Sequence, residues 1–413
     1  MHRPILALVL PWLFFGSAFA DQNHYNNVLI GNRASGLAGA YTAISDDASG
    51  LFYNPAGIVF SEELQLSASA NAIHNSTLEY KDVLGGGDWT RKSSSIVPNF
   101  FGITSKFGDG YIGFSYAVTD FEVEDQDTRF TSIPGFDLFL ININNNDKTT
   151  KLGPSYARKI NDEWNFGVTL YWHERKRELI NNQWIRRSDN TFESSSLFFE
   201  ASESGFEPVI GLMWTPDESF SIGLSIRKTR ITSSRTHNQF SCVSDVPANP
   251  EPQCILIAGS PLDPSITSNR DKRDLPLNTR LGFAYFPTHR LLFAFDISHY
   301  EKVSSTNFSA EEVVNFAFGV EYYLNAEWAL RGGYYTNNAN TGDISPSGVN
   351  QADHVDLEGI SFSISRFSRT SSISLGLAIA SGKGKAQVFS GSSEIQDLEH
   401  DIETLFLSTS YKF

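Results

Sequence analysis

Residues 164–172 read Trp-Asn-Phe-Gly-Val-Thr-Leu-Tyr-Trp, and this stretch decides the fold. Every second side chain from Trp164 to Trp172 is large and apolar, and those between are mostly small or polar. A period of two is typical of a β-strand with one apolar face. The apolar row matches the about 9–11 residues of a tilted strand that crosses a bilayer. Because the pattern recurs in 220–227, 314–322 and 372–380, we expect transmembrane strands, although alternation alone would also allow a soluble sandwich.

Short and long connections alternate between these strands. Asp109-Gly110 is a hairpin signal, because a type I′ turn needs positive φ at both central residues. Further short turns are expected at 161–163, 216–218, 288–289, 324–326 and 368–369, and longer polar segments at 81–94, 125–147, 181–203, 234–274, 303–311, 338–354 and 382–403. Six turns and seven loops join fourteen strands. We therefore predict an all-β membrane protein, a 14-stranded antiparallel transmembrane β-barrel over residues 62–413 with 234–274 as its longest loop.

Aromatic side chains gather near the short turns, as in the interfacial girdle of a membrane protein. They are Phe107, Tyr111, Trp164, Trp214, Phe220, Tyr285, Phe286, Tyr322, Tyr323 and Trp328. The chain ends in an alternating stretch whose last residue is Phe413. This ending resembles the signal read by the bacterial barrel-assembly machinery, which is the partner expected during biogenesis.

The start of the chain predicts export. Arg3 precedes an apolar stretch over 5–15, and Ala18-Phe19-Ala20 fits the small-x-small cleavage rule. We interpret residues 1–20 as a signal peptide rather than an anchor, because a spanning helix needs about 20 apolar residues. In an exported chain Cys242 and Cys254 are expected to form a disulfide within the longest loop; two free thiols are the alternative.

Composition excludes several classes of function. The chain has 32 basic and 47 acidic residues, a formal charge of −15, and no basic run, so it is not expected to bind nucleic acid. Two cysteines and nine scattered histidines offer no metal spacing. No Gly-x-Ser-x-Gly motif supports an outer-membrane hydrolase. We expect no enzyme activity, no cofactor and no metal.

Residues 21–61 do not alternate and are rich in Gly and Ala. Ser45 or Asp46 is expected to cap a helix over 47–53, which ends at Asn54 because the residue before a proline disfavours the α conformation. Pro55 then starts a second short turn. Small residues permit close packing, so this segment is expected to lie in the lumen as a partly helical hatch.

Three ordered elements of this segment carry a resemblance to a known family. They are the Gly- and Ala-rich run 36–43, Asp46-Asp47-Ala48 and Asn54-Pro55-Ala56. The segment resembles the N-terminal hatch of the FadL/TodX family of outer-membrane channels for long-chain fatty acids and other hydrophobic compounds. The resemblance implies a Gram-negative outer membrane, substrate capture by extracellular loops, and lateral release through a gap at a kinked third strand. The hatch and lateral gate would then comprise Asn54, Pro55, Ala56, Gly36, Gly39, Asp46 and Asp47; helix punctuation is the alternative for Asn54-Pro55-Ala56.

The expected third strand, 111–123, has a small inward face at Gly113, Ser115 and Ala117. Its regular parity would turn the even-numbered acidic residues that follow, such as Asp120 and Glu124, outward.

The start of the mature chain departs from the family. Family members usually begin with apolar residues that reach the ligand, whereas residues 21–27 here are largely polar. Either the first apolar run, Val28, Leu29 and Ile30, takes that role, or the ligand differs.

Strand parity also points charged side chains into the lumen. Glu321 and Arg331 lie near a shared turn and are expected to pair. Arg227 or Arg280 either holds a substrate carboxylate, for which a guanidinium group is suited, or belongs to a structural network.

The predicted function is passive uptake of long-chain fatty acids or similar hydrophobic molecules by a monomer surrounded by outer-membrane lipid and lipopolysaccharide. The alternatives are an aromatic-hydrocarbon channel of the same family, a polar-solute porin, and a surface adhesin.

Overall fold

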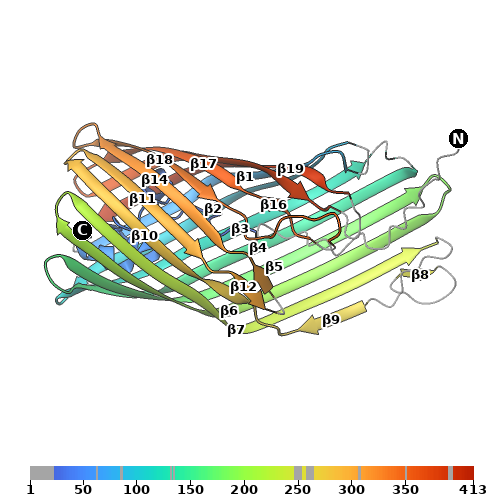
Figure 1. Ribbon diagram of the computed structural model, residues 1–413, viewed down its shortest axis with the longest axis horizontal. Helices are drawn as coiled ribbons and strands as arrows, with labels where there is room; N and C mark the ends of the chain where they lie inside the picture. The colour runs from blue at the N-terminus through green and yellow to red at the C-terminus, as the bar shows by residue number, and fades with distance from the viewer. Residues whose placement is uncertain are drawn as a thin grey trace.

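Fourteen antiparallel strands close into a long barrel in the computed structural model (Figure 1). The structure describes residues 23–61, 64–83, 87–130, 133, 135–245, 254–256, 265–305, 308–348, 351–388 and 394–413, and only the backbone of 254–256. The first strand pairs with both the second and the last, which closes the wall. The predicted signal peptide lies outside the described residues.

The barrel strands follow one another around the wall in chain order. They are β1 (Leu64–Tyr80), β2 (Trp89–Phe107), β3 (Gly110–Phe130), β4 (Phe136–Lys159), β5 (Trp164–Arg187), β6 (Phe192–Asp217), β7 (Phe220–Ser244), β10 (Asp274–Thr288), β11 (Leu291–Tyr300), β14 (Val313–Tyr323), β15 (Trp328–Asn337), β17 (Leu357–Phe367), β18 (Ser371–Ala386) and β19 (Gln396–Lys412). Five short strands lie in the long connections: β8 (Cys254–Leu256), β9 (Ser265–Asn269), β12 (Val303–Ser305), β13 (Phe308–Ala310) and β16 (His354–Val355).

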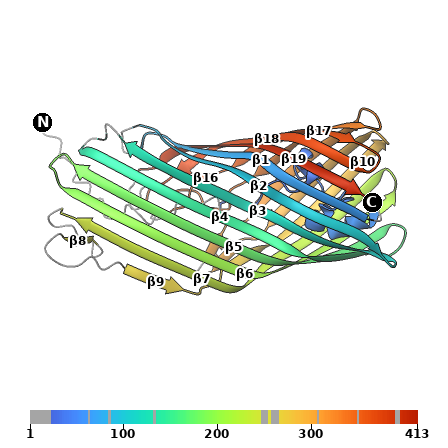
Figure 2. The same cartoon turned by 180° about the vertical axis from the view of Figure 1, so that it is seen from behind.

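Several strands are much longer than the sequence predicts. β4 to β7 have 24 to 26 residues each, and they extend far past the end of β10, β11 and β14 (Figures 1 and 2). The expectation of long loops at 125–147 and 181–203 is wrong, because most of both ranges is strand. Beyond the apolar belt the outward residues of these strands are mostly polar, whereas the inner face still carries buried apolar side chains such as Phe139, Ile141 and Leu179. The expectation of loops followed the polar residues and missed these apolar ones.

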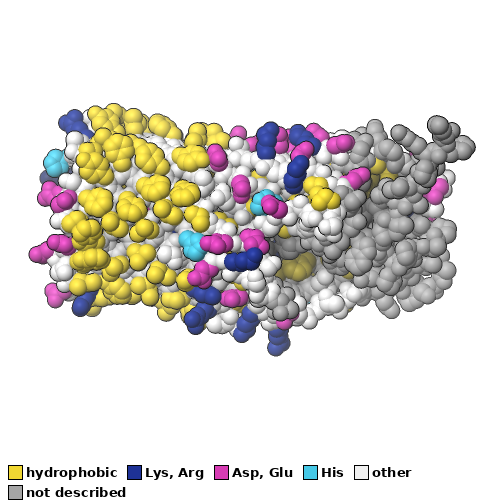
Figure 3. All heavy atoms as spheres, in the orientation of Figure 1, with side chains coloured by type: hydrophobic (Ala, Val, Ile, Leu, Met, Phe, Trp, Pro, Cys, Tyr) yellow, Lys and Arg dark blue, Asp and Glu magenta, His cyan; other side chains and the backbone are white. Residues whose placement is uncertain are grey.

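On the face drawn in Figure 3, an apolar belt covers the short-turn end of the barrel, between charged residues at the rim and a charged band near mid-length. Exposed large apolar side chains occur on every barrel strand, so the belt continues around the wall. Trp172 on β5 and Phe206 on β6, with ring centroids 5.0 Å apart, end the apolar rows of these strands on the side away from the short turns, because polar residues such as Glu174 and Ser204 follow in the outward rows. Most of the predicted aromatic girdle lies on this outer surface. Tyr111, Phe286 and Tyr323 do not, because their side chains pack inward.

The hairpin between β2 and β3 differs from the predicted type I′ turn. Its central residues are Gly108 and Asp109, and only Gly108 has a positive φ, +57°. Gly110 already begins β3. The turn residue with a positive φ is therefore Gly108, which precedes Asp109, and not Gly110, which follows it.

A β-bulge interrupts β3 between Val118 and Asp120. A bulge adds one residue and thereby shifts the parity of the strand. Asp120 consequently accepts a hydrogen bond from Asn27 in the hatch, at 3.2 Å, and Glu124 is fully buried. The expectation that these carboxylates face outward is wrong.

The backbone ladder between β2 and β3 stops where this bulge begins. It extends from Phe107↔Gly110 to Phe100↔Ala117. Beyond Phe100 and Ala117, on the side away from the short turn, the two strands are joined by side chains. The main contact is the buried ion pair of Arg91 with Glu124 at 2.6 Å. The upper part of this strand pair therefore lacks the hydrogen-bonded ladder that joins its neighbours.

The hatch lies inside the barrel at its short-turn end (Figure 1). It contains α1 (Asn32–Gly36), α2 (Gly50–Tyr53) and the 3₁₀ helix η1 (Pro55–Phe60), none of which is long and apolar enough to cross a membrane. The helix predicted over 47–53 begins only at Gly50, because the Asp47 carboxylate accepts from the backbone N of Ser49 at 2.8 Å. Asn54 ends it in an extended conformation and caps η1 by accepting from the backbone N of Ala56 at 3.1 Å.

Glycines on the inner wall make room for the hatch. A Cβ atom added at Gly223 on β7 would lie 2.1 Å from the carbonyl oxygen of Thr42. One added at Gly211 on β6 would lie 2.1 Å from Oδ1 of Asn54. The small inward face of these strands is thus explained by direct contact between wall and hatch.

Candidate ligand pocket in the lumen

A cavity of about 180 Å³ lies between the hatch and the barrel wall. Its floor and one side come from the start of the described chain and α2, through His24, Tyr25, Asn27 and Phe52. The rest comes from β3 to β7, β10 and β11, from Arg273 just before β10, and from Phe308 on β13.

The wall of this pocket is unusually rich in cationic side chains. They are Lys151 on β4, Arg175 on β5, Arg227 on β7, Arg280 on β10, and Arg273 just before β10. Three have a close carboxylate partner: Lys151 binds Glu207 at 2.6 Å, Arg273 binds Glu203 at 2.7 Å, and Arg175 binds Asp147. The other two arginines, Arg227 and Arg280, are less well compensated.

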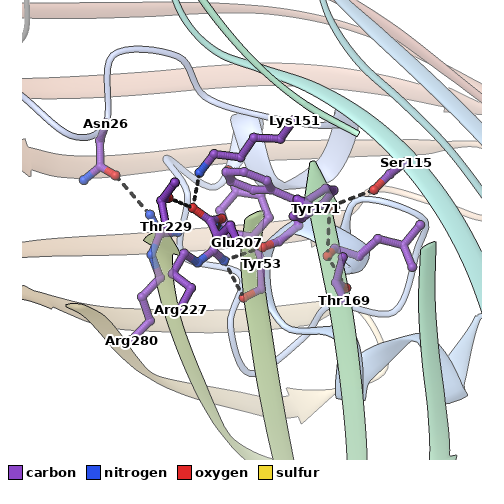
Figure 4. A network of polar contacts seen from close by, with 12 residues as sticks. Asn26, Tyr53, Ser115, Lys151, Thr169, Tyr171, Glu207, Arg227, Thr229 and Arg280 are labelled. Atoms are coloured by element: carbon purple, nitrogen blue, oxygen red, sulfur yellow. Dashed lines mark hydrogen bonds and ion pairs between the residues drawn. The ribbon is translucent and has the colours of Figure 1, made fainter. Parts of the chain in front are cut away.

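Arg227 joins the wall to the hatch (Figure 4). Its Nη2 donates to the carbonyl oxygens of Phe52 and Tyr53, the latter at 3.2 Å. Its guanidinium carbon lies 4.7 Å from the centroid of the Phe52 ring. The nearest carboxylate oxygen, Oε1 of Glu207, is 3.8 Å away, whereas Oε2 of the same carboxylate accepts from Lys151 and Thr229.

Arg280 has no carboxylate within ion-pair distance among the described residues. Its Nη2 donates to Oδ1 of Asn26 at 3.0 Å and to the hydroxyl of Tyr300 at 3.4 Å. Its Nε is buried and makes no hydrogen bond within the described part of the chain. A buried, uncompensated guanidinium is costly unless water or a ligand completes its surroundings.

Other lining groups also lack partners. His173 is 4% exposed, and neither ring nitrogen makes a hydrogen bond within the described structure. The same holds for both side-chain polar atoms of Asn278. Because buried polar groups are nearly always satisfied, these atoms are candidate binding positions for the polar part of a ligand.

The predicted apolar residues do not line this pocket. Val28 and Leu29 border a smaller cavity of about 50 Å³, and Ile30 is buried in the hatch core. The polar residues that precede them reach the main pocket instead, as Tyr25 does by stacking on Tyr300 at 4.1 Å. The only sequence signal for this arrangement was the departure of residues 21–27 from the family pattern.

Glu321 and Arg331 lie close together, 2.5 Å between carboxylate and guanidinium, but they do not line the pocket. Arg33 of the hatch binds Glu321 at 2.5 Å and Asp46 at 2.7 Å. This group fastens α1 to β14 and β15. Sequence reasoning missed Arg33, because one cation in a Gly-rich run gives no pattern.

Asn54, Pro55 and Ala56 pack against β5 and β6. Asn54 donates to the carbonyl oxygens of Thr42 at 2.8 Å and Leu212 at 3.1 Å, and Pro55 contacts Gly167. Besides the hydrogen bond from Asn27 to Asp120, the hatch contacts β3 through Leu51, which would lie 2.4 Å from a Cβ at Gly113. The role of Asn54-Pro55-Ala56 in a gate stays a prediction.

The remaining predicted hatch residues have structural surroundings. Gly36 lies so close to β17 that a Cβ atom would be 2.2 Å from Oγ of Ser363, and Gly39 has a φ of +85°. Asp47 binds the Ser49 hydroxyl and backbone as described above.

The cysteines lie on neighbouring strands, since β7 and β8 pair in parallel with Cys242 opposite Cys254. The side chain of Cys254 is outside the described part, so the disulfide stays a prediction. Within the described ranges no group of three His, Cys, Asp or Glu side chains is arranged to hold a metal ion.

A plugged, fourteen-stranded barrel of this kind also occurs in other solved structures. No family model and no curated protein sequence matches this chain. Solved structures do match over nearly the whole length. A Pseudomonas aeruginosa FadL homologue has 15% identity and a TM-score of 0.65, with 94% of this chain and 98% of that chain covered. The Pseudomonas putida toluene transporter TodX has 14% identity and a TM-score of 0.62, with 92% and 97% covered.

The Ralstonia pickettii toluene transporter TbuX is similar as well, at 12% identity and a TM-score of 0.58, with 93% of this chain and 98% of that chain covered. At such low identity the likeness concerns the fold. The chain therefore has the FadL/TodX-type fold, which agrees with the resemblance of its hatch segment.

Proposed function

We propose that this protein is an outer-membrane channel of the FadL/TodX type for passive uptake of hydrophobic compounds, with long-chain fatty acids as the favoured substrate. The shared fold supports the channel class. The apolar belt around the closed wall supports a position in a membrane (Figure 3). A Gram-negative outer membrane is where barrels of this kind occur.

We favour a fatty acid as the substrate because Arg280 lies in the pocket without a carboxylate partner among the described residues. A fatty acid has a carboxylate that can accept from the free Nε of Arg280 and from His173. Toluene offers no such group. Although two of the similar channels are described as toluene transporters, this polar pocket favours an amphipathic acid.

The structure also suggests a path. Substrate would be captured by the long connections at the far end and would then enter the pocket. Thr119 and Asp120, at the bulge of β3, line that pocket where the β2–β3 ladder has just ended. Lateral release there would place the apolar chain in the bilayer, and the hydrophobic effect would drive that step without ATP.

The test is uptake by cells that lack their own fatty-acid channel and express this protein. Labelled oleate and labelled toluene are compared for the wild type, for Arg227→Gln/Arg280→Gln, and for Lys228→Gln. Lys228 is the matched control, because it lies next to Arg227 in sequence but pairs with Asp274 at the surface, at 3.3 Å.

We expect oleate uptake by the wild type and by Lys228→Gln, and a loss of about tenfold or more in the double variant. Equal toluene uptake by all three would be compatible with this result. Toluene uptake without oleate uptake would instead make the protein an aromatic-hydrocarbon channel. No uptake of either compound by correctly inserted protein would contradict the channel itself.

A further inference from the structure

A further cavity lies outside the lumen, at the rim of the short-turn end. Its volume is about 510 Å³. It is formed by the turn between β14 and β15, residues 324–327, and the turn between β17 and β18, residues 368–370. The two turns are neighbours because β15 pairs with β17, with Trp328 opposite Arg366.

One side of this groove continues the apolar belt. Ile360, Phe362 and Ile364 form an exposed outward row on β17, and Arg366 is the next residue in that row. On β18 the outward row ends at Ile373, which lines the groove and is 59% exposed. The row of exposed apolar side chains on β17 thus ends at the guanidinium group of Arg366, at the edge of the apolar belt.

The other side of the groove is basic and polar. Arg366 and Arg369 both line it, and neither has an ion-pair partner in the described part of the chain. Arg366 is oriented by the ring of Trp328, with the guanidinium carbon 5.7 Å from the centroid. Ser368 and Ser371 add hydroxyl groups, and Glu327 is the one acidic residue of the lining. The chain as a whole is acidic, with a formal charge of −15. The lining of this groove, with two arginines and one glutamate, is instead locally basic.

The short turns of outer-membrane barrels face the periplasm, and this groove lies at the short-turn end. We propose that it binds an anionic glycerophospholipid from the periplasmic leaflet. The phosphodiester would contact Arg366 and Arg369, since guanidinium groups match phosphate oxygens. One acyl chain would follow the outward row of β17 or β18. The proposal rests on the membrane placement given under the proposed function, but not on the identity of the transported substrate.

The test uses the full chain purified in detergent and measures retained lipid by native mass spectrometry. Dioleoylphosphatidylglycerol, dioleoylglycerol and inorganic phosphate are added separately. The variants are Arg366→Gln/Arg369→Gln and, as a control, Arg158→Gln. Arg158 is an exposed arginine on β4 near the same rim, and it does not line the groove. The heat-dependent shift in gel mobility reports an intact barrel for each variant.

We expect the wild type and Arg158→Gln to retain phosphatidylglycerol, with retention lower by about tenfold in the double variant. Dioleoylglycerol should be retained weakly by all three. Equal phosphatidylglycerol retention by the double variant and the control would overturn the proposal, as would equal retention of the phospholipid and the neutral lipid. Binding of free phosphate without the phospholipid would reduce the groove to an anion site and would also overturn it. Because lipid retention needs no transport, its failure is distinguishable from failure of oleate uptake.

Discussion

At the scale of single residues, strand parity is informative wherever the strand is regular. It correctly turns Arg227 and Arg280 toward the lumen, and both line the pocket. It gives no information about which of them lacks a carboxylate partner, because that depends on Glu207, which lies on another strand. The sequence likewise gives no sign that Tyr25 lines the pocket, because Tyr25 belongs to a segment without periodicity.

Wall glycines offer a prediction at this scale. Replacing Gly223 by Leu would force a side chain into the space of Thr42, where even a Cβ atom would lie 2.1 Å from a carbonyl oxygen. Overpacking of this kind costs about 1–3 kcal/mol or more, so we expect the hatch to be displaced. Limited proteolysis should then cut residues 40–56 faster than in the wild type.

The control is Gly332→Leu, also in a barrel strand. A Cβ atom there would have only the carbonyl oxygen of Ser361 nearby, at 3.8 Å. Equal protection of the hatch in Gly223→Leu and Gly332→Leu would show that the contact does not constrain the hatch.

At the scale of elements, the sequence predicts the number of barrel strands but not their length or their irregularities. The alternation in β5 ends near Trp172, yet the ladder with β6 continues to Arg186↔Phe192. The bulge in β3 is also invisible, because Val118, Thr119 and Asp120 would fit a regular strand. A one-residue insertion changes only backbone pairing and leaves no compositional mark.

The upper β2–β3 pair yields the prediction at this scale. Arg91→Ala leaves Glu124 buried without its partner, and breaking such a pair costs about 3–5 kcal/mol. No backbone ladder joins these two segments to each other, although each pairs with its outer neighbour, β1 or β4. Amide hydrogen exchange should therefore rise roughly a hundredfold in 87–99 and 118–130. The ladder segment 100–107 should change little.

The companion variant is Arg91→Met/Glu124→Gln, which removes both charges and should restore most of the protection. If exchange rose equally in 100–107, or did not rise at all, the ion pair would not be what holds these two strand segments together.

At the scale of the whole molecule, the fold follows from features that extend over many residues. The repeated apolar rows, the alternating connection lengths and the Gly-rich segment before β1 together predict a plugged barrel. The wall and hatch then enclose a pocket whose character is polar and cationic. This combination is the reason for assigning an amphipathic acid to the pocket.

The most direct measurement compares two ligands that differ only in their head group. Equilibrium affinities of oleate and oleyl alcohol are measured with the purified protein, for the wild type and for Arg280→Gln. Charge-assisted hydrogen bonds contribute about 1.5–3 kcal/mol each, so the wild type should prefer oleate by roughly tenfold or more. Arg280→Gln should lose that preference while its affinity for oleyl alcohol is unchanged. Equal affinity of the wild type for the two ligands would contradict the assignment of a carboxylate to this pocket.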